Sequence, residues 1–126
     1  MVDRAAVVRG AAVAVAVCLP LALLGQAVDD ADGSSFTALL FVGVLAGFAA
    51  GGAVAARRAR EVPFTNGGLA ALVAYVAIQG TALVVGAVTD GDPPSVPSLV
   101  FNALLAYGCG VAGSALAGRR ARRTAT

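Results

Sequence analysis

The chain has 126 residues, of which 59% are hydrophobic and only 13% are charged. Soluble domains carry about 25% charged residues, so this chain lacks the polar surface that water requires, and its composition favours an integral membrane protein. All nine basic residues are Arg, and His is absent. The absence of His removes the commonest metal ligand and the usual proton carrier near neutral pH, so we expect neither a metal nor another cofactor.

Four long apolar segments follow one another along the chain, at residues 5–24, 36–56, 67–88 and 98–118. Each is close to the roughly 20 residues that a helix needs to cross the hydrocarbon core of a bilayer. The segments lack the strict alternation of a barrel strand, and lipid requires the backbone to satisfy its own hydrogen bonds. The sequence therefore predicts an all-α protein, with four transmembrane helices in one compact domain spanning residues 1–126.

The connections between these segments carry signals for helix starts. Thr65 and Asn66 precede the third segment and are expected to cap its helix, and Ser98 follows a Pro-rich stretch and is expected to cap the fourth. The first segment, with Arg4 before it and Arg9 near its start, also admits a second interpretation as a signal peptide cleaved near Gly25. Cleavage there would leave three helices instead of four.

Charge predicts the orientation of the helices. Every Arg lies at the N-terminal end, after the second segment or in the C-terminal tail, whereas the other two connections contain Asp and no basic residue. The positive-inside rule places the Arg-rich side in the cytoplasm, so we expect a bacterial inner-membrane protein with both termini cytoplasmic. The predicted topology anchors are Arg57, Arg58, Arg60, Arg119, Arg120, Arg122 and Arg123.

A weak internal repeat accompanies this charge pattern. A shift of 62 residues aligns residues 57–60 with residues 119–122, both reading Arg-Arg-Ala-Arg, and also aligns Gly51 with Gly113. Such a repeat would make the protein two tandem helical hairpins with the same orientation, related by an axis along the membrane normal. Chance matches are easy in an Ala- and Gly-rich sequence, so duplication and coincidence both stay open.

Small residues recur every four positions in the second and fourth segments. Residues four apart share a helix face, and small side chains there let two helix backbones approach closely. We expect these faces to pack within the bundle, with docking of a partner or of a second copy as the alternative. The predicted packing residues are Gly43, Gly47, Gly51, Gly110 and Ser114.

Two amides stand out inside the apolar segments. Gln79 lies near the centre of the third segment, and Asn102 lies near the start of the fourth. A buried amide in hydrocarbon needs a partner, so Gln79 is expected to bond to a neighbouring helix. No Asp, Glu, Lys or His falls within the four segments, although proton-coupled transporters usually keep such a group there. Without His there is also no Ser/His or Cys/His pair, and we predict that the protein is not an enzyme.

The central third of the chain has a recognisable pattern. It runs from Gly47 to Arg58 and continues with Pro63 and the residues 66–71, which read Asn-Gly-Gly-Leu-Ala-Ala. This stretch resembles small actinobacterial four-helix membrane proteins of unknown function. The resemblance implies a four-helix fold, and it implies no activity, substrate or cofactor.

These observations leave two hypotheses for function. The first is a structural or accessory subunit that packs through Gly/Ala helix faces, and the second is a small homo-oligomeric channel or carrier in which Gln79 and Asn102 line a polar path. The expected partners are the lipid bilayer and either a second copy or a larger membrane protein. Nucleic acid is not expected, because the Arg clusters are short and close to the headgroups.

Overall fold

The computed structural model describes residues 1–28, 34–59, 61–89 and 91–124. Within these ranges the chain forms four α-helices and no strand, which confirms the predicted all-α four-helix fold. Each helix is long and apolar enough to cross a membrane. In chain order the helices are α1 (Arg4–Val28), α2 (Ser34–Arg58), α3 (Pro63–Val88) and α4 (Val96–Thr124).

The helices begin earlier than the cap residues in the sequence suggest. Helix α3 starts at Pro63, and its N-cap is Val62, a left-handed residue with φ 42° and ψ 56° and no side-chain cap. Proline suits the first turn of a helix, because its φ is already helical and the N–H it lacks would have no partner there. The expected caps at Thr65 and Asn66 are therefore wrong. The same holds for Ser98, because α4 starts at Val96 and includes Pro97.

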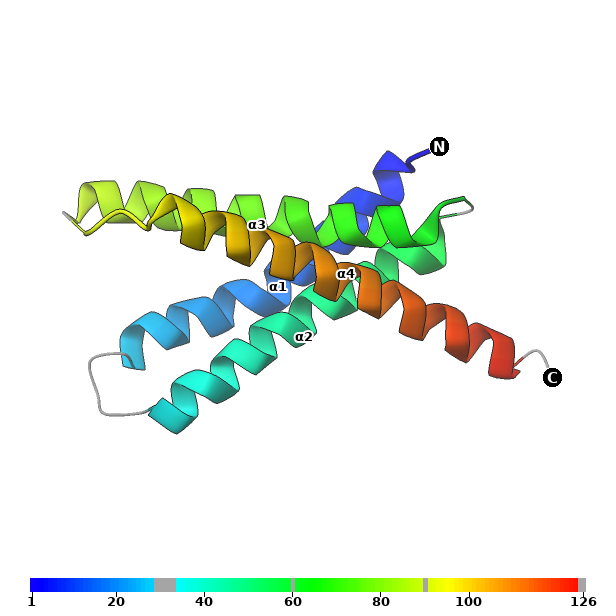
Figure 1. Cartoon of the computed structure of the whole chain (residues 1–126), viewed down its shortest axis with the longest axis horizontal. Helices are drawn as coiled ribbons and strands as arrows, with labels where there is room; N and C mark the ends of the chain where they lie inside the picture. The colour runs from blue at the N-terminus through cyan, green and yellow to red at the C-terminus, as the bar shows by residue number, and fades with distance from the viewer. Residues whose placement is uncertain (29–33, 60, 90, 125–126) are drawn as a thin grey trace.

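Successive helices run antiparallel (Figure 1). The N-terminus, the turn between α2 and α3 and the end of α4 lie together at what we call the arginine end, and the two remaining connections lie at the loop end. Helices α1 and α4 each pack against both α2 and α3, and α2 also contacts α3. Across the described residues, α1 and α4 do not touch.

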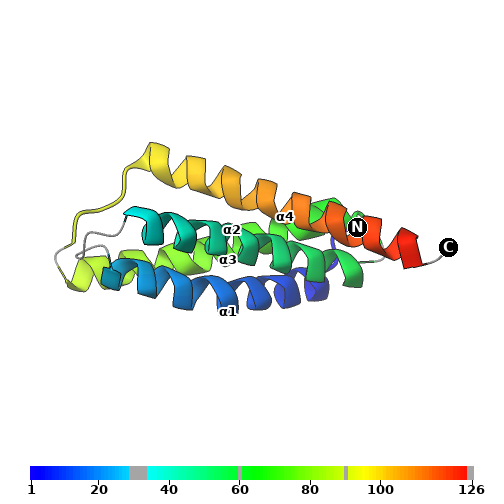
Figure 2. The same ribbon diagram turned by 90° about the horizontal axis from the view of Figure 1, so that it is seen from below.

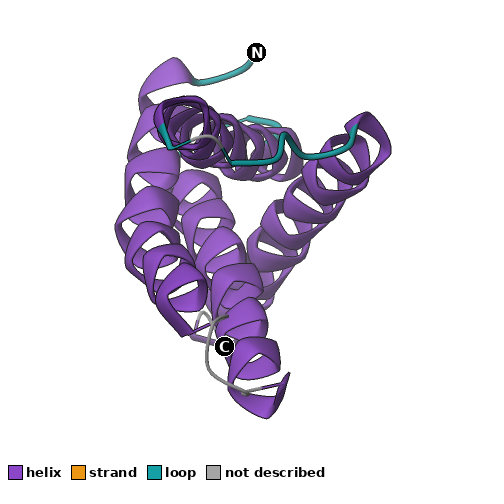
Figure 3. Ribbon diagram, turned by 90° about the vertical axis from the view of Figure 1, so that its left-hand side faces the viewer, coloured by secondary structure: helices purple, strands orange, loops and turns teal. Residues whose placement is uncertain are grey.

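Helices α3 and α4 pack closely against the rest of the bundle only toward the arginine end. All the buried residues of α3 lie between Asn66 and Ala74, and none of its residues from Tyr75 to Val88 is buried. Helix α4 likewise buries residues only between Ala106 and Ala117. The start of α4 stands away from the other helices in Figure 2, and Figure 3 gives the view from the loop end. Helices α1 and α2 stay in contact there, because Leu40 is buried and a Cβ on Gly43 would lie 3.0 Å from Leu21. The bundle is thus closed at the arginine end and splayed at the loop end.

Glycine makes the close packing possible. A Cβ atom added to Gly51 of α2 would lie 2.6 Å from the carbonyl oxygen of Gly10 in α1, and a Cβ added to Gly10 would lie 2.5 Å from the carbonyl oxygen of Gly51. A Cβ on Gly52 would overlap the backbone of Gly110 in α4, and one on Gly113 would overlap the backbone of Ala49. At these crossings backbone meets backbone, which gains dispersion energy that lipid does not provide.

The contacts between the helices can be compared with those that a two-fold internal repeat would produce. Gly52 and Ser114, which are 62 positions apart, contact each other where α2 crosses α4. A two-fold relation between the hairpins would also make the pairs α2–α3 and α1–α4 equivalent. Helices α2 and α3 are in contact, whereas the described residues of α1 and α4 are not. The two hairpins therefore pack unequally, whatever their origin.

Substitution at the crossing should cost more stability than substitution on an open glycine. We expect Gly51→Val to destabilise the protein by about 3 kcal/mol, at the upper end for overpacking, because its new atoms meet helix backbone. Gly80→Val is the matched control, since a Cβ on Gly80 meets no atom within 4 Å. Thermal unfolding in a mild detergent measures the difference, and equal melting temperatures for the two variants would contradict the packing described here.

Candidate functional site

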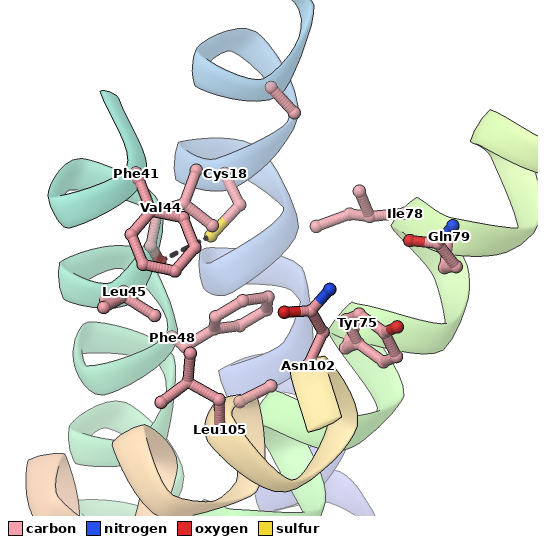
Figure 4. A pocket seen from close by; sticks show the side chains of 12 residues that line it. Cys18, Phe41, Val44, Leu45, Phe48, Tyr75, Ile78, Gln79, Asn102 and Leu105 are labelled. Atoms are coloured by element: carbon pink, nitrogen blue, oxygen red, sulfur yellow. Dashed lines mark hydrogen bonds between the residues drawn. The ribbon is translucent and has the colours of Figure 1, made fainter. Parts of the chain in front are cut away.

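A cavity of about 170 Å³ lies where the two hairpins separate (Figure 4). All four helices contribute to its wall, which is mostly apolar and carries no charged side chain among the described residues. Its polar groups are one thiol, one phenol and two amides. The lining residues are Cys18, Ala22, Phe41, Val44, Leu45, Phe48, Tyr75, Ile78, Gln79, Asn102, Leu105 and Ala106.

Two of the polar groups are occupied by contacts between helices. The thiol of Cys18, which is fully buried, donates to the carbonyl oxygen of Val44 at 3.3 Å and so links α1 to α2. The hydroxyl of Tyr75 donates to the carbonyl oxygen of Leu99 at 3.0 Å and links α3 to α4. Both cysteines, Cys18 and Cys109, are free. The thiol and the phenol therefore hold the walls of the cavity in place.

The two amides are not occupied in this way. Neither Gln79 nor Asn102 has a hydrogen-bond partner among the described residues, and both side chains are partly exposed to the cavity. The expected bond from Gln79 to a neighbouring helix is therefore wrong. In Figure 4 the amide of Asn102 points into the space between α2 and α3, and Gln79 lies on the α3 side of that space. An amide in apolar surroundings without a partner loses free energy.

A second, larger cavity adjoins the first at Gln79. It measures about 710 Å³ and lies toward the loop end, between the last turns of α3 and the connection that follows them. Leu83, Thr89, Asp92 and Pro94 are among its lining residues, together with Gln79 itself. Gln79 thus lines both cavities, and the glycine crossings close the bundle toward the arginine end.

A third amide, Asn66, organises the arginine end. Its side chain is fully buried; its oxygen accepts the backbone N–H of Asp3 at 2.9 Å, and its nitrogen lies 3.0 and 3.1 Å from the carbonyl oxygens of Glu61 and Val62. Asp3 in turn caps α1 by accepting the backbone N–H of Ala6 at 3.1 Å. Asn66 thus ties the start of α1 to the turn between α2 and α3.

An exposed ion pair lies close to this turn. The N-terminal ammonium of Met1 is 2.6 Å from Oε2 of Glu61. Its hydrogen bond, and then its charge, lower the pKa of the Glu61 carboxyl. Because both groups are exposed to solvent, the pair contributes little to stability.

The predicted packing residues all lie at contacts between helices of the same chain. A Cβ on Gly43 would lie 3.0 Å from a methyl carbon of Leu21, and one on Gly47 would lie 2.5 Å from Sγ of Cys18. The hydroxyl of Ser114 lies 3.2 Å from the carbonyl oxygen of Gly52 and 2.9 Å from that of Gly110. Gly51 faces α1, as described above, and Gly110 faces α3.

Five of the seven predicted topology anchors have described side chains, and these five lie at the arginine end. Arg57 and Arg58 form the last turn of α2, where their charge suits the negative end of the helix dipole, and both are exposed. Arg119, Arg120 and Arg123 are exposed on the last turns of α4. Arg60 and the side chain of Arg122 lie outside the described part of the chain. The same is true of four of the five loop aspartates, Asp29, Asp30, Asp32 and Asp90.

Sequence reasoning missed several residues that the structure brings into contact. Gly52, Gly67 and Gly113 make backbone contacts as close as those of the predicted glycines, but they fall outside the spacing of four that was searched. The sequence predicts a helix cap at Asn66, whereas its side chain donates instead to the carbonyl oxygens of Glu61 and Val62 in the turn before α3. Tyr75 had only the weak signal of a hydroxyl inside an apolar segment.

Comparison with protein-family models, with curated proteins and with solved structures finds no match to this chain. The fold and the cavity therefore define the class of protein, a four-helix bundle of membrane-spanning type with an inter-hairpin cavity.

Two asparagines provide a matched pair for testing the roles assigned to the amides. Asn66→Leu should destabilise the protein by about 2–3 kcal/mol, because it removes three hydrogen bonds made by a fully buried side chain. Asn102→Leu should be neutral or stabilising, because Asn102 has no partner in the described chain and Leu suits an apolar wall. Thermal unfolding in detergent distinguishes the two, and a larger loss for Asn102→Leu would refute this assignment.

Proposed function

We propose that this protein is a non-catalytic accessory subunit of a larger membrane protein, and that it resides in the bacterial cytoplasmic membrane with both termini in the cytoplasm. The orientation is supported by the Arg residues at the ends of α2 and α4, which share one end of the bundle with the N-terminus. The accessory role is supported by helix surface suited to close packing that the bundle itself leaves uncovered.

The uncovered surface belongs to α3 and α4. Every described glycine of α1 and α2 has a neighbouring side chain or backbone within 4 Å of the position of an added Cβ, so those glycines serve packing inside the chain. Gly80 and Gly86 of α3 and Gly108 and Gly118 of α4 have no such neighbour among the described atoms. An uncovered glycine in a membrane helix exposes backbone to close approach by another helix.

Helix α4 carries the best-defined part of this surface. Leu104, Gly108, Ala112 and Leu116 recur every four residues, and all four are exposed. Gly108 and Ala112 are small residues that lie between Leu104 and Leu116 on this face. A partner helix could therefore bring its backbone close to Gly108 and Ala112, while the two leucines contact its sides. The single observation that carries the proposal is that this face of α4 is open in the folded chain, whereas the face through Gly110 is filled.

A carrier or channel formed by several copies is the second candidate. It is favoured by the two cavities that share Gln79 as a lining residue, one in the middle of the bundle and one toward the loop end. In that function the polar path would contain Gln79 and Asn102.

Gly108 and Gly110 of α4 provide a test variant and a misfolding control for the accessory role. In Gly108→Ile the new side chain projects away from the bundle, so the chain should fold normally and lose its partner when it is purified in a mild detergent from its own host. Gly110→Ile is the control for misfolding, because a Cβ there would overlap the backbone of Gly67. Native mass spectrometry of the extracted protein measures the stoichiometry of any complex.

The composition of the complex distinguishes the accessory subunit from the channel or carrier. A larger membrane protein that accompanies the wild-type chain at fixed stoichiometry, and is lost in Gly108→Ile, is the expected result. A complex made only of this chain, together with solute flux in liposomes, would move the assignment to the channel or carrier. A wild-type monomer with no partner would overturn both proposals.

A further inference from the structure

We propose that the inter-hairpin cavity is a binding site for a neutral amphiphile, an apolar ring or chain that carries one hydroxyl or carbonyl group. The cavity is the one lined by Cys18, Tyr75, Gln79 and Asn102 together with apolar side chains. The site lies within this chain and does not depend on the face of α4 that the accessory role uses.

The lining of the cavity indicates a ligand without charge. None of the described side chains that line it is Asp, Glu, Lys, Arg or His, so an ion entering it would be desolvated with no opposite charge from these residues to compensate. The aromatic and aliphatic walls formed by Phe41, Phe48, Ile78 and Leu105 instead favour an apolar body. A cavity of about 150 Å³ holds a benzene ring, so this cavity of about 170 Å³ holds a ring or a short stretch of chain.

The free amides indicate that the ligand also carries a hydrogen-bonding group. Gln79 and Asn102 come from neighbouring helices, and each offers both a donor and an acceptor. Cys18 and Tyr75 in the same wall are already engaged with the backbone carbonyls of Val44 and Leu99. The two amides are thus the polar groups of the wall that remain for a ligand, and a hydroxyl or carbonyl group would satisfy them.

The position of Gln79 also gives the route by which the ligand enters. Gln79 lines both the central cavity and the larger cavity toward the loop end. The outer part of α3 buries none of its residues from Tyr75 to Val88, so the wall on that side is not covered by other helices. The glycine crossings prevent passage toward the arginine end. A ligand from the bilayer or from the solution at the loop end can therefore reach the amides.

Photolabelling with a diazirine derivative of 1-octanol tests the site directly. The intact protein in lipid nanodiscs is irradiated with the probe, and peptide mass spectrometry locates the adducts. The expected adducts fall on the cavity residues, in particular on Tyr75 and on the segment around Asn102. Unmodified octanol should compete for labelling, whereas octane and octanoate should compete much more weakly, because one lacks the hydroxyl group and the other carries a charge.

Two variants remove different parts of the site. The double variant Gln79→Leu/Asn102→Leu keeps an apolar cavity without the amides, and cavity labelling should fall about fivefold to tenfold, as expected for loss of one or two hydrogen bonds. Ala22→Phe fills the cavity from α1 while both amides stay in place, and it should abolish cavity labelling. Size-exclusion chromatography checks that each variant is folded.

The proposal is overturned if cavity labelling is unchanged in both variants, or if octane and octanoate compete as well as octanol. It is equally overturned if adducts appear only on lipid-facing residues such as Val76 and Val84. The source of the natural ligand is resolved by mass spectrometry of solvent extracts from the purified wild-type and Ala22→Phe proteins. A neutral lipid enriched with the wild type identifies a ligand from the bilayer, and equal extracts together with cavity labelling indicate a free ligand from the loop end.

Discussion

Direct contact between helix backbones is the constraint on which the rest of this structure depends. In lipid there is no hydrophobic gain from bringing two apolar helices together, so association requires close packing or polar contacts. Gly10, Gly51, Gly52 and Gly110 provide that packing, because any side chain at these positions would overlap a neighbouring helix. They lie on α1, α2 and α4, away from the loop end, and this places the backbone contacts of the bundle toward the arginine end.

The distribution of polar groups follows from this unequal packing. Where the helices are close, polar side chains find backbone partners, as Asn66 does at the turn before α3 and Ser114 does at the crossing of α2 with α4. Where the helices diverge, Gln79 and Asn102 face a cavity and have no partner among the described residues. The same residue type is thus a structural tie at one end and a candidate ligand contact at the other.

The sequence was sufficient to predict the number and type of the helices, because length and hydropathy leave few alternatives in a bilayer. It also marked Gly51 and Gly110 through their spacing. It could not predict that Gly113 packs on α2 while Gly108 stays open, since both lie on α4 and only the crossing geometry distinguishes them. The role of Gln79 was predicted wrongly for a related reason. A polar residue in an apolar segment signals a need for a partner, but not whether a neighbouring helix is within reach.

The central claim is that the bundle is closed at the arginine end and open at the loop end. Double electron–electron resonance between spin labels on α2 and α4, with Cys18 and Cys109 replaced by Ala, tests it most directly. One pair at Ala50 and Ala112 reports on the crossing, and a second pair at Leu39 and Val100 reports on the loop end. The structure predicts a short, narrow distance distribution for the first pair and a clearly longer mean distance for the second. Similar mean distances for the two pairs would show that α2 and α4 do not diverge toward the loop end, and would contradict this account.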